Sequence, residues 1–85
     1  VHYLGTLEDG TIFDASWRRG QPFTTQIGVG RVIPGWDQGM IGMKEGGRRL
    51  LHIPSDLAYG KNGSGSTIGP DTPLVFVVDL LRIHN

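Results

Sequence analysis

Residues 74–83 read LVFVVDLLRI, and the alternation of their side chains is that of a β-strand. One face of this strand carries Leu74, Phe76, Val78 and Leu80. The opposite face carries Val75, Val77, Leu81 and Ile83, and only Asp79 interrupts it. Because a strand with two apolar faces is covered on both sides, the pattern predicts a central strand of a sheet.

Four shorter segments outside this strand also have strand character, and turn residues separate them. They span residues 1–5, 11–14, 22–27 and 48–53. Gly10 follows two acidic residues in a turn sequence, where the chain reverses and glycine adopts a positive φ without strain. Short connections of this kind are typical of antiparallel strands.

One helix is expected, over residues 32–41. Ile33, Trp36 and Met40 share one stripe of it, at the spacing of a buried helix face. Pro34 suits the first turn, where its missing N–H costs nothing. Glycines at positions 35, 39 and 42 make the helix weak in isolation but allow close approach to a sheet. The sequence therefore predicts an α+β fold, a short helix over an antiparallel sheet.

The composition limits the possible functions. The chain has 85 residues, which suit a single domain over 1–85, and it contains no cysteine, so it has neither disulfides nor a thiolate zinc site. Eight basic residues balance eight acidic ones, which argues against a nucleic-acid partner held through phosphates. No apolar run approaches the roughly 20 residues of a membrane span. The compartment is not encoded here, although the lack of cysteine favours a reducing one such as the cytoplasm.

Conventional catalytic motifs are absent from the sequence. Gly28 and Gly30 begin a dinucleotide-binding pattern, but Ile33 occupies the position of its third glycine. The three histidines, at 2, 52 and 84, are far apart, so we expect surface or packing histidines rather than a metal site. The arginine pairs 18–19 and 48–49 have the pattern of solvated faces.

Seven aromatic residues are the remaining chemical signal, and composition alone leaves two interpretations open. They form either the core of a small domain or the lining of an apolar pocket. The seven are Tyr3, Phe13, Trp17, Phe23, Trp36, Tyr59 and Phe76.

Five short motifs in register resemble the FKBP-type peptidyl-prolyl cis–trans isomerases, which also bind the macrolides tacrolimus and rapamycin. They are VHYLGTLEDG (1–10), FDAS (13–16), VIPGW (32–36), AYG (58–60) and PLVF (73–76). The resemblance covers essentially the whole chain and implies a twisted antiparallel sheet wrapped around one short helix. Family domains usually extend further at the N-terminus with an additional strand, so we expect a shortened domain that lacks this strand.

The resemblance also implies the residues of a proline-binding pocket, and six of the seven aromatics match it. The expected catalytic residues are Tyr3, Asp14, Tyr59 and Phe76. The expected substrate-binding residues are Phe13, Phe23, Val32, Ile33, Trp36 and Ile68. By resemblance, Trp36 is the floor, and the Tyr59 hydroxyl and the Ile33 N–H donate hydrogen bonds to ligand carbonyls. Asp14 either polarises the twisted amide or anchors neighbouring side chains, whereas Trp17 has no assigned role.

The implied activity is rotation of X–Pro bonds in folding proteins, by a monomer without metal or cofactor. The implied partners are proline-containing peptides, unfolded proteins and macrolides. Two other functions stay open: a non-catalytic module that binds proline peptides, and a scaffold domain within a larger chaperone. The loop 61–70 departs from the family by its glycine and serine content, which raises the entropy cost of ordering it.

Overall fold

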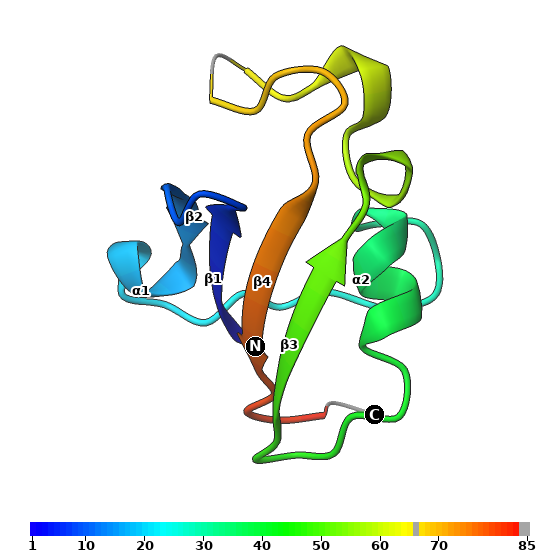
Figure 1. Cartoon of the computed structure of the whole chain (residues 1–85). Coiled ribbons are helices and arrows are strands. Elements are labelled where there is room, and N and C mark those ends of the chain that lie inside the picture. Colours follow the sequence, from blue (N-terminus) through cyan, green and yellow to red (C-terminus); the bar gives the residue numbers. More distant parts are fainter. Residues whose placement is uncertain (66, 84–85) are drawn as a thin grey trace.

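A four-stranded antiparallel sheet forms the centre of the computed structural model, which describes residues 1–65 and 67–83 (Figure 1). The strand order is β2-β1-β4-β3. The strands are β1 (His2–Leu7), β2 (Ile12–Ala15), β3 (Arg48–Ile53) and β4 (Leu74–Asp79).

The β4 strand lies between β1 and β3, which confirms the central position predicted from its two apolar faces. Leu74 and Val78 on its inner face are completely buried. The predicted continuation to residue 83 is wrong, because both neighbours of Asp79 are the first residues of their strands. Of the described residues 80–83, only Leu80 makes hydrogen bonds to other backbone groups, those of Gly46 and Gly47 in the turn before β3.

The β1–β2 hairpin turns at Gly10, whose φ of +92° is the conformation expected from the sequence. The Leu7 N–H donates to the Thr11 carbonyl at 2.9 Å and closes the turn. The strand register shifts between Gly5 and Thr6, which is a bulge in the ladder. This bulge lies next to the residues that form the pocket described below.

Helix α2 (Pro34–Gly39) packs across one face of the sheet (Figure 1). It confirms the predicted helix, although it is two residues shorter at each end, and Pro34 occupies its first turn. A Cβ on Gly39 would lie 2.8 Å from Leu51 Cδ2, and one on Gly35 would overlap Ile53. The glycines therefore allow the helix to lie directly on β3, as expected.

Two further expectations need correction. Residues 22–27 form no strand: Phe23 exchanges a pair of backbone hydrogen bonds with Val1, at 2.7 and 2.8 Å. Pro22 has no N–H to donate, and the chain then runs behind the sheet toward α2 (Figure 1). A second helix, α1 (Ser16–Arg19), was not predicted, because four residues are too few to show a helical period.

The long segment between β3 and β4 contains two short 3₁₀ helices, η1 (Ser55–Leu57) and η2 (Gly60–Asn62). It extends beyond the ends of the strands, at the top of Figure 1. In the described residues, no helix is both long and apolar enough to cross a membrane.

Candidate active site

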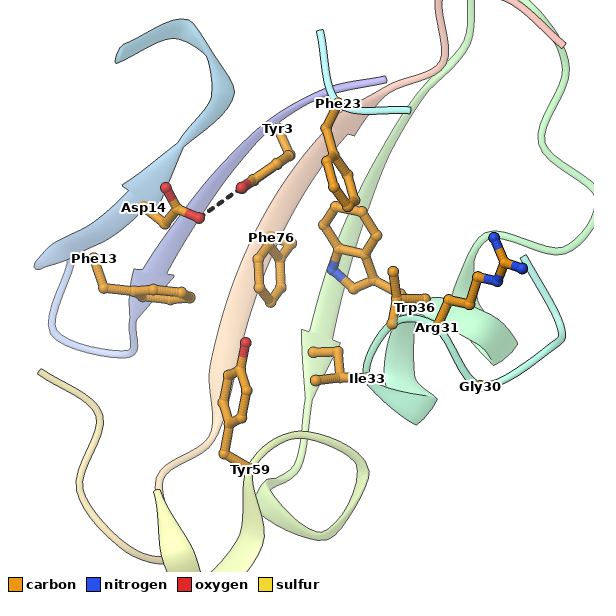
Figure 2. A pocket seen from close by; sticks show the side chains of 11 residues that line it. Tyr3, Phe13, Asp14, Phe23, Gly30, Arg31, Ile33, Trp36, Tyr59 and Phe76 are labelled. Atoms are coloured by element: carbon orange, nitrogen blue, oxygen red, sulfur yellow. Dashed lines mark hydrogen bonds between the residues drawn. The ribbon is translucent and has the colours of Figure 1, made fainter. Parts of the chain in front are cut away.

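A cavity of about 420 Å³ lies between helix α2, the strands β1, β2 and β4, and the segment before η2 (Figure 2). Its lining is mostly aromatic and aliphatic. The lining residues are Tyr3, Phe13, Asp14, Phe23, Gly30, Arg31, Val32, Ile33, Trp36, Tyr59 and Phe76.

Trp36 and Phe76 are the most buried residues of this cavity, each with only 4% of its surface exposed. Trp36 forms the part of the cavity that helix α2 contributes. It is the third residue of α2, and the close contact of that helix with β3 holds it against the sheet. The rings of Tyr3 and Phe76 stand nearly perpendicular to its indole, at centroid distances of 5.1 and 5.2 Å. Edge-to-face contacts of this kind fix the orientation of each ring.

The indole Nε1 of Trp36 is buried and has no hydrogen-bond partner among the described residues. In Figure 2, this nitrogen lies on the side of the indole that is turned toward Phe76. The face of an aromatic ring is weakly negative, so the perpendicular Phe76 ring is a favourable neighbour for an N–H group. The N–H therefore faces apolar surroundings with weak electrostatic support.

Gly5 brings two of the three phenylalanines of the cavity together. Phe13 meets Phe76 edge-to-face at 5.5 Å, directly over the β1 backbone at Gly5. A Cβ on this residue would lie 2.6 Å from Phe13 Cζ and 2.8 Å from Phe76 Cε1. Sequence reasoning missed this role, although a glycine inside a strand is a recognised sign of close approach.

Asp14 anchors a network of three side chains at the edge of the cavity. The Tyr3 hydroxyl donates to its Oδ2 at 2.6 Å, as Figure 2 shows. Arg19 donates from Nη1 to Asp14 Oδ1 at 2.9 Å and from Nη2 to the Tyr3 oxygen at 2.7 Å. The Ala15 N–H donates to Oδ1 as well, at 2.8 Å. The geometry therefore favours anchoring, one of the two roles expected for Asp14.

This network shifts two pKa values in opposite directions. Burial acts to raise the pKa of Asp14, but hydrogen bonds from Tyr3, Arg19 and the Ala15 N–H outweigh it and lower the pKa below 3.8. Burial and the hydrogen bond to Asp14 raise the pKa of Tyr3 above 10.0, against an opposing effect of Arg19. Near neutral pH, Asp14 is thus an anion and Tyr3 a neutral hydrogen-bond donor.

Ile33 links the cavity to helix α2. Its carbonyl accepts the N–H groups of Trp36 and Asp37, at 2.9 and 3.2 Å, which places it at the helix start. Among the described residues its own N–H makes no backbone hydrogen bond. Its expected role, donation to a ligand carbonyl, stays a prediction.

Tyr59 approaches the cavity from the segment between the two 3₁₀ helices. Its hydroxyl points toward the centre of the cavity (Figure 2), and the residue is 39% exposed. A hydroxyl in this position can donate a hydrogen bond to a carbonyl bound over Trp36.

The structure gathers nine of the ten predicted site residues around one cavity, and their individual roles stay predictions. Ile68 is the exception: it does not line the cavity, and it is buried in the core with 5% exposure. Its backbone forms a reciprocal pair of hydrogen bonds with Ser64, at 2.8 and 3.2 Å, which turns the loop back on itself. The expected contact of Ile68 with substrate stays a prediction.

Besides Gly5, three participants were missed by sequence reasoning. Gly30 and Arg31 line the cavity. Gly30 was considered only as part of a rejected dinucleotide-binding pattern, and no motif distinguished Arg31. Arg19 was interpreted as part of a solvated pair, but it joins Asp14 and Tyr3. Trp17, which had no assigned role, stacks on His2 at 4.9 Å outside the cavity.

Metal ligation has no geometric support in the described part of the chain. His2 contacts the Ser16 hydroxyl at 2.7 Å, and His52 lies 3.1 Å from Glu8. Within residues 1–65 and 67–83, no three side chains of histidine, aspartate or glutamate come together. His84 lies outside the described residues.

Comparisons with known proteins agree with this geometry. Residues 1–81 match the family model of FKBP-type peptidyl-prolyl cis–trans isomerases. The chain is 58% identical over 85 residues to FK506-binding protein 2 of Yarrowia lipolytica. It is 56% identical over 84 residues to the FK506-binding protein of Neisseria meningitidis serogroup C, and 53% identical over 84 residues to human peptidyl-prolyl cis-trans isomerase FKBP2.

These matches cover nearly all of this chain but different shares of the relatives. The chain spans 59% of the Yarrowia and human proteins and 77% of the Neisseria protein. Among solved structures, AtFKBP13 superimposes with a TM-score of 0.92 at 45% identity, covering 98% of this chain and 75% of that one. The superposition confirms the predicted fold class. With the matched motifs and the aromatic cavity, it shows that the chain belongs to the FKBP-type peptidyl-prolyl cis–trans isomerases, a family of enzymes.

Proposed function

We propose that this chain accelerates rotation about X–Pro peptide bonds, and that the cavity over Trp36 is where it does so. The single observation that carries this proposal is the composition of the cavity. Aromatic rings form its floor and walls, and two hydrogen-bond donors, the Tyr59 hydroxyl and the Ile33 N–H, are available at its edge.

Rotation of a peptide bond faces a barrier of about 18–20 kcal/mol, because the nitrogen lone pair is delocalised into the carbonyl. At X–Pro bonds the two isomers differ by only about 0.5–1 kcal/mol, so the reaction is limited by rate and not by equilibrium. In the twisted transition state this delocalisation is lost and the charge separation of the amide falls. An apolar cavity therefore favours the twisted amide over the planar one, and about 1.4 kcal/mol of difference accelerates the reaction tenfold.

The residues of the cavity supply this effect without a nucleophile or a titrating group. Trp36 is a flat platform for the proline ring, and Phe76 and Phe23 exclude water from its sides. The Tyr59 hydroxyl and the Ile33 N–H orient the carbonyls on either side of the rotating bond. Asp14 acts through Tyr3: with Arg19 it holds the tyrosine ring upright against the indole.

The same cavity accounts for the proposed ligands. A proline ring and the similar ring of a macrolide such as tacrolimus both present an apolar face and neighbouring carbonyls. The relatives named FK506-binding proteins support macrolide binding by this chain. Assistance to protein folding follows if the X–Pro bonds belong to unfolded chains, and the monomeric state stays a prediction.

The test is two-dimensional exchange NMR on a short Leu-Pro peptide, with and without the protein. We expect cis–trans exchange peaks only in the presence of protein, and we expect equimolar tacrolimus to remove them. Shifted peptide resonances without exchange peaks would identify a non-catalytic binding module. Exchange that survives saturation with bound tacrolimus would show that catalysis does not occur in this cavity.

A further inference from the structure

One wall of the cavity is built from a segment without regular structure. Residues 28–33 lead into α2, and four of them, positions 30–33, line the cavity. Gly28 and Gly30 adopt φ angles of +85° and +77°. Among the described residues, the backbone of positions 28–32 makes no hydrogen bond to another backbone group. Up to Val32, therefore, neither a sheet ladder nor helical hydrogen bonds determine the position of this wall.

Asp37 of helix α2 provides the missing contacts. The Gly28 N–H donates to Asp37 Oδ1 at 2.9 Å, and the Gly30 N–H donates to Oδ2 at 3.0 Å. Each carboxylate oxygen thus accepts one backbone N–H of the wall, and the two hydrogen bonds together are called the tether below. Asp37 itself does not line the cavity and does not face the substrate position.

We propose that Asp37 is a positioning residue, which ties residues 28–33 to α2 and so holds the substrate-binding wall in place. This inference rests on the proposed function of the cavity. The tether fixes the start of the segment, and the cap at Ile33 fixes its end, so the Ile33 N–H and the Val32 side chain are held between two fixed points. Without the tether, a bound peptide must itself order the wall, which weakens binding.

The chemistry requires a carboxylate. Two backbone N–H donors converge on this side chain, and a carboxylate offers an acceptor to each. An asparagine has one acceptor oxygen, and its NH₂ group would face the second N–H donor. Charge-assisted hydrogen bonds are also stronger than neutral ones.

The experiment compares Asp37→Asn, Asp37→Ala and Asp37→Glu. Asp56→Ala is the matched control, because Asp56 is an exposed acid in the short helix η1 and does not line the cavity. Titration with the Leu-Pro peptide gives Kd, and exchange NMR at saturation gives the maximal rate. The amide signals of Gly28 and Gly30 report the tether directly.

In Asp37→Asn and Asp37→Ala, we expect the Gly28 and Gly30 amide signals to move and Kd to rise about tenfold, or about 1.4 kcal/mol. The maximal rate should stay within about twofold of the wild-type rate, because the groups that contact the rotating bond are unchanged. Asp37→Glu keeps both acceptors and should recover part of the affinity. A purely structural role would lower the melting temperature without this separation of Kd from rate.

Wild-type Kd in a folded Asp37→Asn protein whose glycine signals have moved would overturn the proposal. Unmoved glycine signals would also overturn it, since they would show that no tether exists. If Asp37→Ala does not fold, the nearly isosteric Asp37→Asn variant decides alone. Failure of the proposed function has a different signature: the folded wild-type protein would show no exchange peaks, although its glycine signals still respond to Asp37→Asn.

Discussion

On the β1–β2 side of the cavity, ladder hydrogen bonds and the Tyr3–Asp14–Arg19 network position the aromatic rings. On the opposite side, residues 28–33 have no ladder, and one carboxylate and one helix cap hold them. The first wall presents rings whose orientation is fixed on several sides. The second presents a backbone N–H and aliphatic side chains on a segment that few contacts hold. We expect substitutions in the first wall to change ring packing, and those in the second to change ligand affinity.

Trp36→Ala should have the largest effect, because the indole lies between the two walls and contacts the rings of Tyr3, Phe23 and Phe76. Loss of a buried tryptophan costs about 3–5 kcal/mol of stability, and the platform for the proline ring disappears with it. We expect no detectable binding of tacrolimus in a titration.

Circular dichroism shows whether this variant folds. Trp17→Ala is the control, because Trp17 is 46% exposed and lies outside the cavity. Tight tacrolimus binding by a folded Trp36→Ala protein would mean that the ligand binds elsewhere.

Gly5→Ala tests the sheet wall alone. The added Cβ would overlap Phe13 and Phe76, so one ring must move, at a cost of about 1–3 kcal/mol in stability. We expect kcat/KM for the Leu-Pro peptide to fall about tenfold. Gly69→Ala is the control, since the nearest atom to a Cβ added at Gly69 would be Thr72 Oγ1, at 3.8 Å. Unchanged kcat/KM and melting temperature would show that Phe13 and Phe76 are not held rigidly.

Arg19→Leu should have a smaller effect than either change. The Arg19 and Asp14 side chains are 50% and 40% exposed, and water screens such pairs strongly. We expect kcat/KM to fall only about two- to threefold, because the hydrogen bond from Tyr3 to Asp14 remains. Arg18→Leu serves as the control on the same helix. A loss as large as that of Gly5→Ala would make Arg19 essential to the wall.

The smallest change is expected with pH. The pKa of Asp14 is lowered on folding, so the stability it contributes is present above pH 3.8 and is lost as the pH falls through the folded value. The pKa of Tyr3 is raised, so its contribution is present below pH 10.0 and is lost as the pH rises through the folded value. Between about pH 5 and 9, neither group titrates, and kcat/KM should vary less than about twofold. A bell-shaped profile in this window would reveal a titrating catalytic group.

The elements with strong periodicity were predictable. The alternation in residues 74–79 identified the central strand, and Pro34, Trp36 and Met40 identified the helix. The predicted end of this strand was wrong, because the apolar pattern continues past the point where the neighbouring strands begin. Residues 80–83 are as apolar as those before them, yet β1 and β3 both begin opposite Asp79. Strand ends depend on neighbouring strands, which a local pattern does not encode.

For the site, the kinds of residue were predictable and some positions were not. The aromatic residues, their motifs and Asp14 were recognisable in the chain, because residue type carries the apolar and hydrogen-bonding chemistry of the pocket. Ile68 is buried in the core and pairs through its backbone with Ser64. Arg19 donates a hydrogen bond to Tyr3, which is sixteen positions away in sequence. Composition and periodicity thus specify which side chains are available and how each segment is built. Which of them meet in one cavity depends on contacts between distant segments, and these arise only when the sheet and helix pack together.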